Sequence, residues 1–175
     1  SKSDAEDGKS KDALDTLCCL AEVLLVKGRN IANSYAVLPD ILSALLRGSG
    51  NAHLETAKTC HNACLLIAQG IKACLCLPED GVISESSVIK VLKGEMYDTS
   101  WHVRETVMMC LSGFMVGNWT SLSLDDRKIC KEVFTQGFLD LKPEIQQLAR
   151  VGLIAYLSHK TPTELKSFAE AFCRN

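Results

Sequence analysis

The sequence "YDTSWHVRETV" at residues 97–107 decides the fold, because its pattern returns 42 residues further along the chain. The shift brings Asp98 onto Asp140 and Trp101 onto Pro143. The apolar positions coincide as well, in the pairs Val103 and Ile145, Val107 and Ala149, Leu111 and Leu153, and Phe114 and Tyr156. The two segments therefore predict the same kind of helix in two successive repeats.

The predicted helix ends carry specific signals. Proline favours the first helical position, where its missing N–H is not needed, so Pro143 predicts a helix start. The repeated pattern then makes Ser100 the predicted N-cap of the earlier helix. At residues 161–164, "TPTE" places Thr161 at an N-cap, a proline at the first helical position and Glu164 at the third, as in a capping box.

Apolar residues recur with helical spacing along nearly the whole chain. Eight helices are predicted, at residues 14–25, 37–46, 54–71, 88–92, 101–115, 129–139, 144–157 and 163–172. The segment "RGSGN" at 47–51 is expected to end one helix and to provide Asn51 as the cap of the next. The only strand-like segment, "GVIS" at 81–84, is too short to count. The pattern predicts an all-α fold.

A period near 42 residues with two antiparallel helices in each unit is typical of HEAT-type repeats, whose helix pairs bury their apolar faces only by stacking. We therefore predict a HEAT-like α-solenoid fragment of four antiparallel helix pairs at residues 11–175. Its best-registered repeats are 97–139 and 140–175. Residues 1–10 are polar and charged, and we expect a disordered linker there.

Asp98 and Arg104 suit a ladder of charges, in which an acid before one helix and an arginine inside it connect neighbouring repeats. Trp101 is expected to pack against a neighbouring helix, and Asp140 holds the acid's place in the next repeat. Gln146 stands where a second arginine would be. The arginine of the ladder is therefore expected to be missing from the second repeat. The alternative is a solvated surface pair that contributes less than about 1 kcal/mol.

The charge and hydropathy patterns disfavour two classes of partner. The net charge is −2 over 175 residues without a block of like charges, so no basic face for nucleic acid is predicted. The longest apolar stretch, at 63–77, contains Gln69 and Lys72 and is shorter than the roughly 20 residues that cross a bilayer. We expect no direct nucleic-acid partner and no membrane partner.

The nine cysteines are odd in number and lie inside helical patterns, which argues against a disulfide framework. We expect Cys18, Cys19, Cys110 and Cys130 to be small core residues in a reducing compartment. The alternative is a zinc site drawn from Cys60, His61, Cys64, Cys74 and Cys76. The last two of these diverge on a helix, so tetrahedral coordination would require a break in it, and we predict no metal.

Motifs of enzymes are not found. The chain has no Gly-x-Ser-x-Gly, no phosphate-binding Gly-x-x-x-x-Gly-Lys and no Gly-x-Gly-x-x-Gly after a strand. Cys60 and His61 are consecutive, so on a helix they point about 100° apart and do not form a nucleophile and base. We predict a protein without catalytic activity or cofactor.

The segments "TSWHVRETVMMCLSGFMVGN" at 99–118 and "LDLKPEIQQLARVGLIAYLS" at 139–158 together resemble the carboxy-terminal HEAT array of the proteasome activator subunit 4 family. The resemblance covers residues 97–158. It implies a nuclear solenoid, with the cytoplasm as a further location, that caps the proteasome core particle and promotes ubiquitin-independent degradation. The family's hydrophobic-Tyr-any ending is replaced here by "FCRN", so we expect an excised fragment.

The resemblance also implies a bromodomain-like region that binds acetylated histone tails. The Asn-aromatic pair expected after the last repeat falls on Lys160 and Thr161, but such a pair occurs one repeat earlier, as Asn118 and Trp119. Together with Tyr97 it is the candidate acetyl-lysine site, where an amide donates to the acetyl oxygen and aromatic rings contact the methylene stem. The alternative is structural, with Asn118 in a left-handed helix cap and Trp119 packed between repeats.

Three functions stay open on the sequence alone. The chain is expected to be a non-catalytic interaction segment of the proteasome activator. The first alternative is a self-standing acetyl-lysine or histone-tail reader built from the same helices. The second is a HEAT scaffold from another pathway, such as transport or microtubule assembly.

Overall fold

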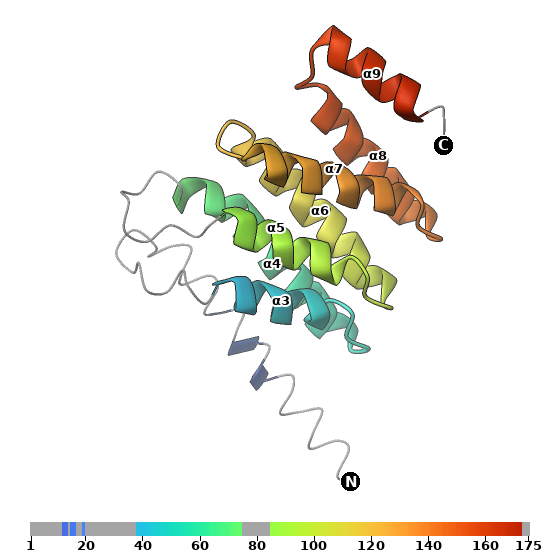
Figure 1. Cartoon of the computed structure of the whole chain (residues 1–175). Coiled ribbons are helices and arrows are strands. Elements are labelled where there is room, and N and C mark those ends of the chain that lie inside the picture. The colour runs from blue at the N-terminus through green and yellow to red at the C-terminus, as the bar shows by residue number, and fades with distance from the viewer. Residues whose placement is uncertain (1–11, 14, 17–18, 20–37, 75–84, 173–175) are drawn as a thin grey trace.

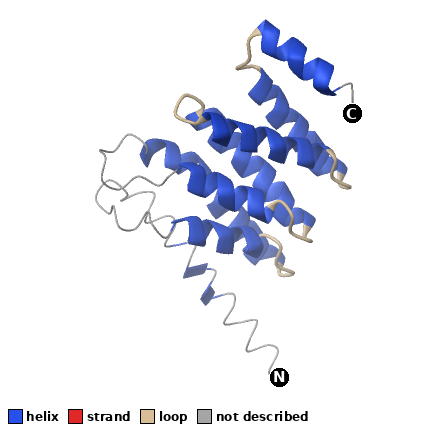
Figure 2. Cartoon of the chain, viewed as in Figure 1, coloured by secondary structure: helices blue, strands red, loops and turns tan. Residues whose placement is uncertain are grey.

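The computed structural model describes residues 12–13, 15–16, 19, 38–74 and 85–172. These ranges contain helices, turns and bends but no strand (Figure 2), which confirms the predicted all-α class. The helices of ten or more residues are α3 (Leu38–Gly48), α4 (Leu54–Cys74), α5 (Glu85–Glu95), α6 (Trp101–Asn118), α7 (Leu124–Phe138), α8 (Pro143–Leu157) and α9 (Pro162–Phe172). The helix predicted at 14–25 and the linker predicted at 1–10 lie largely or wholly outside the described residues.

The described helices form two rows (Figure 1). In one row α4 packs against α6, and α6 packs against α8. In the other row α3 packs against α5, and α5 packs against α7. Helices that follow each other along the chain also connect the rows, as α7 and α8 do, and α9 lies beyond α7 and α8 at one end of the molecule (Figure 1).

The predicted starts of α6 and α8 are confirmed, whereas the predicted cap of α4 is not. Ser100 is the N-cap of α6, although its side chain makes no capping hydrogen bond, and Pro143 is at the start of α8. The expectation for Asn51 was wrong, because α4 begins at Leu54 and the Asn51 side chain instead accepts a hydrogen bond from the N–H of His53. The local sequence around a polar turn residue does not determine at which of the following residues the helix begins.

The capping box at the start of α9 is present. The N–H of Glu164 donates to Thr161 Oγ1 at 3.3 Å, and the N–H of Thr161 donates to Glu164 Oε2 at 2.8 Å. The two residues thus satisfy each other's backbone donors, which otherwise have no partner inside the helix.

The core runs between the two rows and consists mainly of aliphatic side chains. Phe114 and Phe134 are its largest fully buried residues, and each contributes about 1.5–3 kcal/mol relative to an exposed ring. Cys110 and Cys130 are buried as predicted. The prediction for Cys19 was wrong, because that residue is exposed, and Cys18 lies outside the described residues. Helical spacing alone does not tell which face of a helix a neighbour covers.

Helices α7 and α8 meet at a glycine. A Cβ atom added to Gly152 would overlap the ring of Phe134, so the ring of α7 lies directly on the backbone of α8. Among the described residues no helix is both long and apolar enough to span a bilayer.

Candidate functional site

Three turns share one hydrogen-bond arrangement, and these turns precede α4, α6 and α8. In each turn an Asn or Asp side chain accepts a hydrogen bond from the backbone N–H two residues later, which is an Asx turn. The bonds are Asn51 Oδ1 with His53 N at 2.8 Å, Asp98 Oδ1 with Ser100 N at 2.7 Å, and Asp140 Oδ1 with Lys142 N at 2.9 Å. The 42-residue shift in the sequence does not align Asn51 with Asp98, because α4 and α6 begin 47 residues apart whereas α6 and α8 begin 42 apart.

Arg104 connects two successive turns. Its Nε and Nη2 donate to the two carboxylate oxygens of Asp140 at 2.7 and 3.1 Å, and its Nη1 donates to the carbonyl of Asp98 at 2.7 Å. The side chains of Arg104 and Asp140 are only 16% and 8% exposed, so this bidentate pair is largely shielded from water. Gln146, at the matching place in α8, donates to the carbonyl of Asp140 at 2.6 Å. The contact with the backbone carbonyl six residues earlier is therefore present in both α6 and α8, whereas the contact with a carboxylate is present only in α6.

The pKa of Asp140 reflects this environment. Burial by itself disfavours the charged carboxylate, but the hydrogen bonds from Arg104 and from the backbone N–H of Lys142 outweigh it, so the pKa of Asp140 is lowered. Hydrogen bonding to Asp140 in turn raises the pKa of Arg104. Asp140 is therefore ionised in the folded protein at neutral pH.

Trp101 lies beside this pair at the start of α6. Its ring is partly buried and packs against the core, and Lys142 Nζ lies 5.5 Å from the ring centroid. Trp101 thus contacts the turn that precedes α8. The acid, the arginine and the tryptophan of the predicted ladder all lie at this one joint between successive helices.

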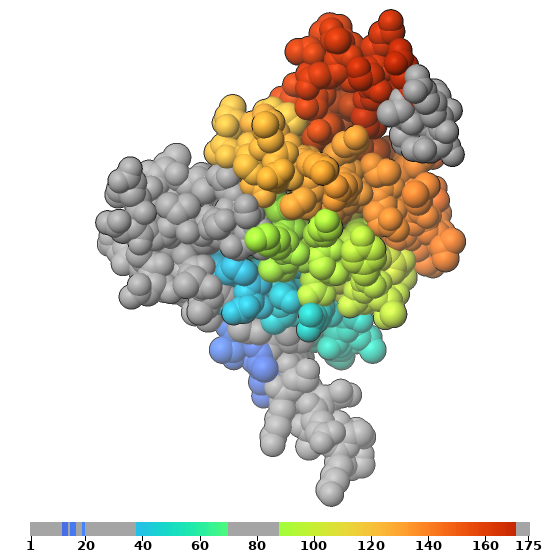
Figure 3. Space-filling model, viewed as in Figure 1, coloured from blue at the N-terminus to red at the C-terminus, as the bar shows by residue number. Residues whose placement is uncertain are grey.

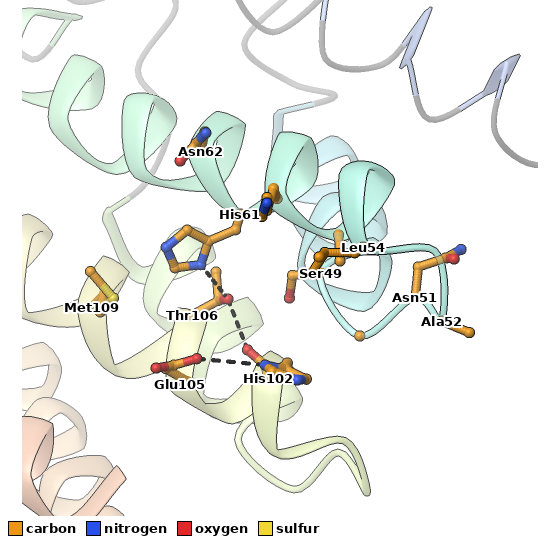
Figure 4. A pocket seen from close by; sticks show the side chains of 13 residues that line it. Ser49, Asn51, Ala52, Leu54, His61, Asn62, His102, Glu105, Thr106 and Met109 are labelled. Carbon is orange, nitrogen blue, oxygen red and sulfur yellow. Dashed lines mark hydrogen bonds and ion pairs between the residues drawn. The ribbon is translucent and has the colours of Figure 1, made fainter. Parts of the chain in front are cut away.

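An open groove of about 660 Å³ lies between α4 and α6, next to the turn that precedes α4 (Figure 4). Most of its exposed lining surface is apolar, and Asn62, His102 and Glu105 add polar groups from the two helices. Met109 of α6 adds an apolar group on the same lining (Figure 4). A groove with amide, imidazole and thioether groups can contact both the backbone and the side chains of a bound peptide.

His61 is positioned in this groove by a chain of hydrogen bonds (Figure 4). Thr106 Oγ1 donates to the carbonyl of His102 at 2.8 Å and lies 2.8 Å from His61 Nδ1. Since the single hydroxyl proton is used for the carbonyl, His61 Nδ1 donates to the hydroxyl oxygen and Nε2 is an acceptor. Burial lowers the pKa of His61, although the charge of Glu105 opposes this, so His61 is neutral at pH 7.

Asn118 is the last residue of α6 and is only 3% exposed. Its Nδ2 donates to the carbonyl of Phe114 at 2.9 Å, inside its own helix. No described residue has a positive φ, so Asn118 is not in the left-handed cap conformation considered as its structural alternative. Its amide is turned into the protein and holds the end of α6.

Trp119 packs where the end of α6, α7 and the end of α8 meet. Its ring is stacked on His159 with a centroid distance of 4.3 Å and meets Tyr156 edge to face at 5.5 Å. The guanidinium of Arg127 lies 4.8 Å from the centroid of the Trp119 ring, and Arg127 Nη2 donates to the backbone carbonyl of Trp119 at 2.9 Å. Trp119 therefore connects the end of α6 with α7 and with the turn after α8.

Tyr97 is 68% exposed and lies before the start of α6, whereas Asn118 ends that helix. A helix of 18 residues is roughly 27 Å long, so Tyr97 and Asn118 lie too far apart to contact one acetyl-lysine side chain. Of the three residues of the candidate acetyl-lysine site, the structure brings together only the sequence neighbours Asn118 and Trp119.

Cys60 and Cys64 are buried in α4. Within the described residues no group of three or more His, Cys, Asp or Glu side chains is arranged to hold a metal ion. Cys76 and the side chain of Cys74, which the zinc alternative requires, lie outside the described part of the chain.

Comparison with known proteins gives no assignment. No family model matches the chain, and no curated protein matches it closely enough to be a relative.

Proposed function

We propose that this chain is a HEAT-like solenoid segment that binds protein partners and has no catalytic activity. We place it within a nuclear proteasome activator that caps the core particle and promotes ubiquitin-independent degradation. The observation that carries the proposal is the recurrence of the same Asx turn before α4, α6 and α8. The sequence resemblance in residues 97–158 supports the proteasome context.

The recurrent turns support the solenoid because they give three successive helices of one row the same entry geometry. Stacked repeats contact only their neighbours, and the packing of α4 on α6 and of α6 on α8 has this character. The pair of Arg104 and Asp140 fixes the relative position of two of these helices. Such a stack presents long surfaces and grooves between helices, which suit protein recognition.

The groove between α4 and α6 supports a role in binding proteins. It is open, with a volume of about 660 Å³, and it offers side-chain donors and acceptors such as Asn62 and His102. His61 is neutral and adds no fixed charge to the lining. We expect this groove to contact the core particle or a protein that is to be degraded.

The test is binding of the labelled chain to purified proteasome core particles, measured by native electrophoresis and analytical ultracentrifugation. We expect the chain to migrate with the particles, and we expect Asn62→Arg and Met109→Arg to reduce this by filling the groove. Lys90→Ala is the matched control, since Lys90 is exposed on α5 in the other row of helices. Absence of co-migration at micromolar chain, or an equal loss in the control, would contradict the proposal.

The acetyl-lysine reader has no comparable support in the geometry, because the Asn118 amide already donates within α6. Titration of acetylated and unmodified histone peptides separates the two functions. We expect equal, weak binding of both. Selective binding of the acetylated peptide that is lost in Asn118→Ala would establish the reader instead.

A further inference from the structure

A second cavity, of about 350 Å³, lies where α7, α8 and α9 meet. We call it the α9 cavity. Its lining includes Lys131 from α7, Tyr156 and Lys160 from α8 and the turn after it, and Thr163, Ser167 and Phe168 from α9. In the space-filling view α9 forms one end of the molecule, beside α7 and α8 (Figure 3). The cavity thus combines two ammonium groups with hydroxyl donors and two aromatic rings.

The ammonium groups of the two lysines in the α9 cavity lie over aromatic rings. Lys131 Nζ lies 5.1 Å from the ring centroid of Phe168, and Lys160 Nζ lies 5.2 Å from that of Tyr156. These cation–π contacts orient the ammonium groups but leave their positive charge unneutralised. An oriented lysine loses less side-chain freedom when it binds a ligand than a fully mobile one does.

The charge balance of the cavity is positive. Lys160 pairs with Glu164 at 3.0 Å, and Glu164 is the only acidic residue among the described residues of the lining. Lys131 forms no ion pair with any residue in the described part of the chain. Two ammonium groups and one carboxylate leave one positive charge, next to Thr163 and Ser167, whose hydroxyl groups can donate to an anion.

We propose that the α9 cavity binds an anionic side chain of a protein partner, either a carboxylate or a phosphate. The ligand would lie between Lys131 and Lys160 and displace the carboxylate of Glu164 from the lysine. This inference rests on the proposed function as a protein-binding segment and names the chemistry of one partner surface. It also predicts that a basic tail is a poor partner here, because Lys131 and Lys160 repel it.

The experiment measures fluorescence anisotropy of labelled peptides that differ only in the charged residue. One peptide carries glutamates, a second carries phosphoserines, a third carries glutamines and a fourth carries lysines. We expect the glutamate or phosphoserine peptide to bind more tightly than the glutamine peptide, with an affinity that falls as salt is added. Binding of only the phosphoserine peptide identifies phosphate as the ligand, and binding of both identifies general anion recognition.

Substitutions localise the site. Lys131→Gln and Lys160→Gln should each weaken binding by roughly two- to fivefold, as is typical of partly exposed charge pairs. Lys128→Gln is the matched control, because Lys128 is an exposed lysine of α7 outside the cavity lining, and it should change binding little.

Glu164→Gln is expected to increase the affinity for anionic peptides. Glutamine can retain the capping box, so α9 is preserved while the carboxylate that competes for Lys160 is removed. We expect anionic peptides to bind this variant more tightly than the wild type. Weaker or unchanged binding in Glu164→Gln, an equal loss in Lys128→Gln, or no preference for anionic peptides would overturn the inference.

Failure here is distinguishable from failure of the proposed function. The Asn62→Arg and Met109→Arg variants leave the α9 cavity intact and should bind anionic peptides normally. Conversely, weaker peptide binding in Lys131→Gln with normal co-migration on core particles would show that the two surfaces act separately.

Discussion

Helices α6 and α9 are attached to the molecule in different ways. Helix α6 lies between α4 and α8, and half of its residues are buried, with Met108, Leu111 and Phe114 fully covered. Helix α9 contributes Phe168 as its one partly covered side chain among those described, and the remainder are exposed. The difference separates two tasks: the row of α4, α6 and α8 provides stability, and the α9 end provides surface that a partner can cover.

The largest expected effect concerns the joint between α6 and α8. Asp140→Ala removes the acceptor of both Arg104 bonds and leaves a mostly buried guanidinium without its counter-charge. We expect a loss of about 3 kcal/mol in the free energy of unfolding, measured with urea. The control is Glu144→Ala, an exposed acid in the first turn of α8, which should cost less than about 1 kcal/mol. Similar losses in both variants would show that the joint does not stabilise the row.

A somewhat smaller loss is expected at the contact of α7 with α8. In Gly152→Ala the new methyl group must displace the ring of Phe134, and such overpacking costs about 2 kcal/mol. Gly113→Ala, on the exposed side of α6 with open space around the new atom, should instead stabilise the protein by about 0.5–1 kcal/mol. Thermal unfolding of both variants measures the two stability changes. If both substitutions stabilise or both destabilise the protein, this packing is contradicted.

Acid should weaken the same joint by a smaller amount. The pKa of Asp140 is lowered in the folded state, so its contribution is fully present above the unfolded value of about 3.9 and is lost as the pH falls through the folded value. The stability difference between wild type and Asp140→Asn should therefore narrow below about pH 4. Urea unfolding from pH 7 to pH 3 measures this. A difference that stays constant with pH would mean that the charge of Asp140 contributes nothing.

The smallest effect on stability is expected at the α9 end. A chain that ends at residue 160 loses no fully buried side chain among those described in α9, so its melting temperature should change by no more than about 3 °C. The same truncation removes Thr163, Ser167 and Phe168 from the α9 cavity, and binding of anionic peptides should no longer exceed the contribution of Lys131 and Lys160 alone. Loss of cooperative unfolding would show that α9 belongs to the stable row after all.

Much of this fold follows from local patterns. Pro143 and the repeated apolar positions predict the starts of α6 and α8, and the sequence "TPTE" predicts the capping box of α9. Each of these signals depends on residues within one or two helical turns. A prediction from sequence succeeds where the stabilising partner lies nearby in the chain.

Contacts between distant residues are not visible in this way. Arg47 donates to Glu95 at 3.0 Å across 48 positions, and His61 meets Thr106 across 45, and no spacing rule singles out these partners. The burial of Asn118 was also missed, because an asparagine at a helix end can point outward or back to the carbonyl four residues earlier. The choice between these conformations is made by the helices that cover it.

The carboxylate of Asp140 has two tasks at once. Its Oδ1 accepts from the N–H of Lys142, which shapes the turn that starts α8, and both of its oxygens accept from Arg104 of α6. The first turn of α8 is therefore completed on a group that α6 already holds in place. The entry geometry of α8 and the packing of α8 on α6 therefore depend on one carboxylate, so a substitution at Asp140 disturbs both at once.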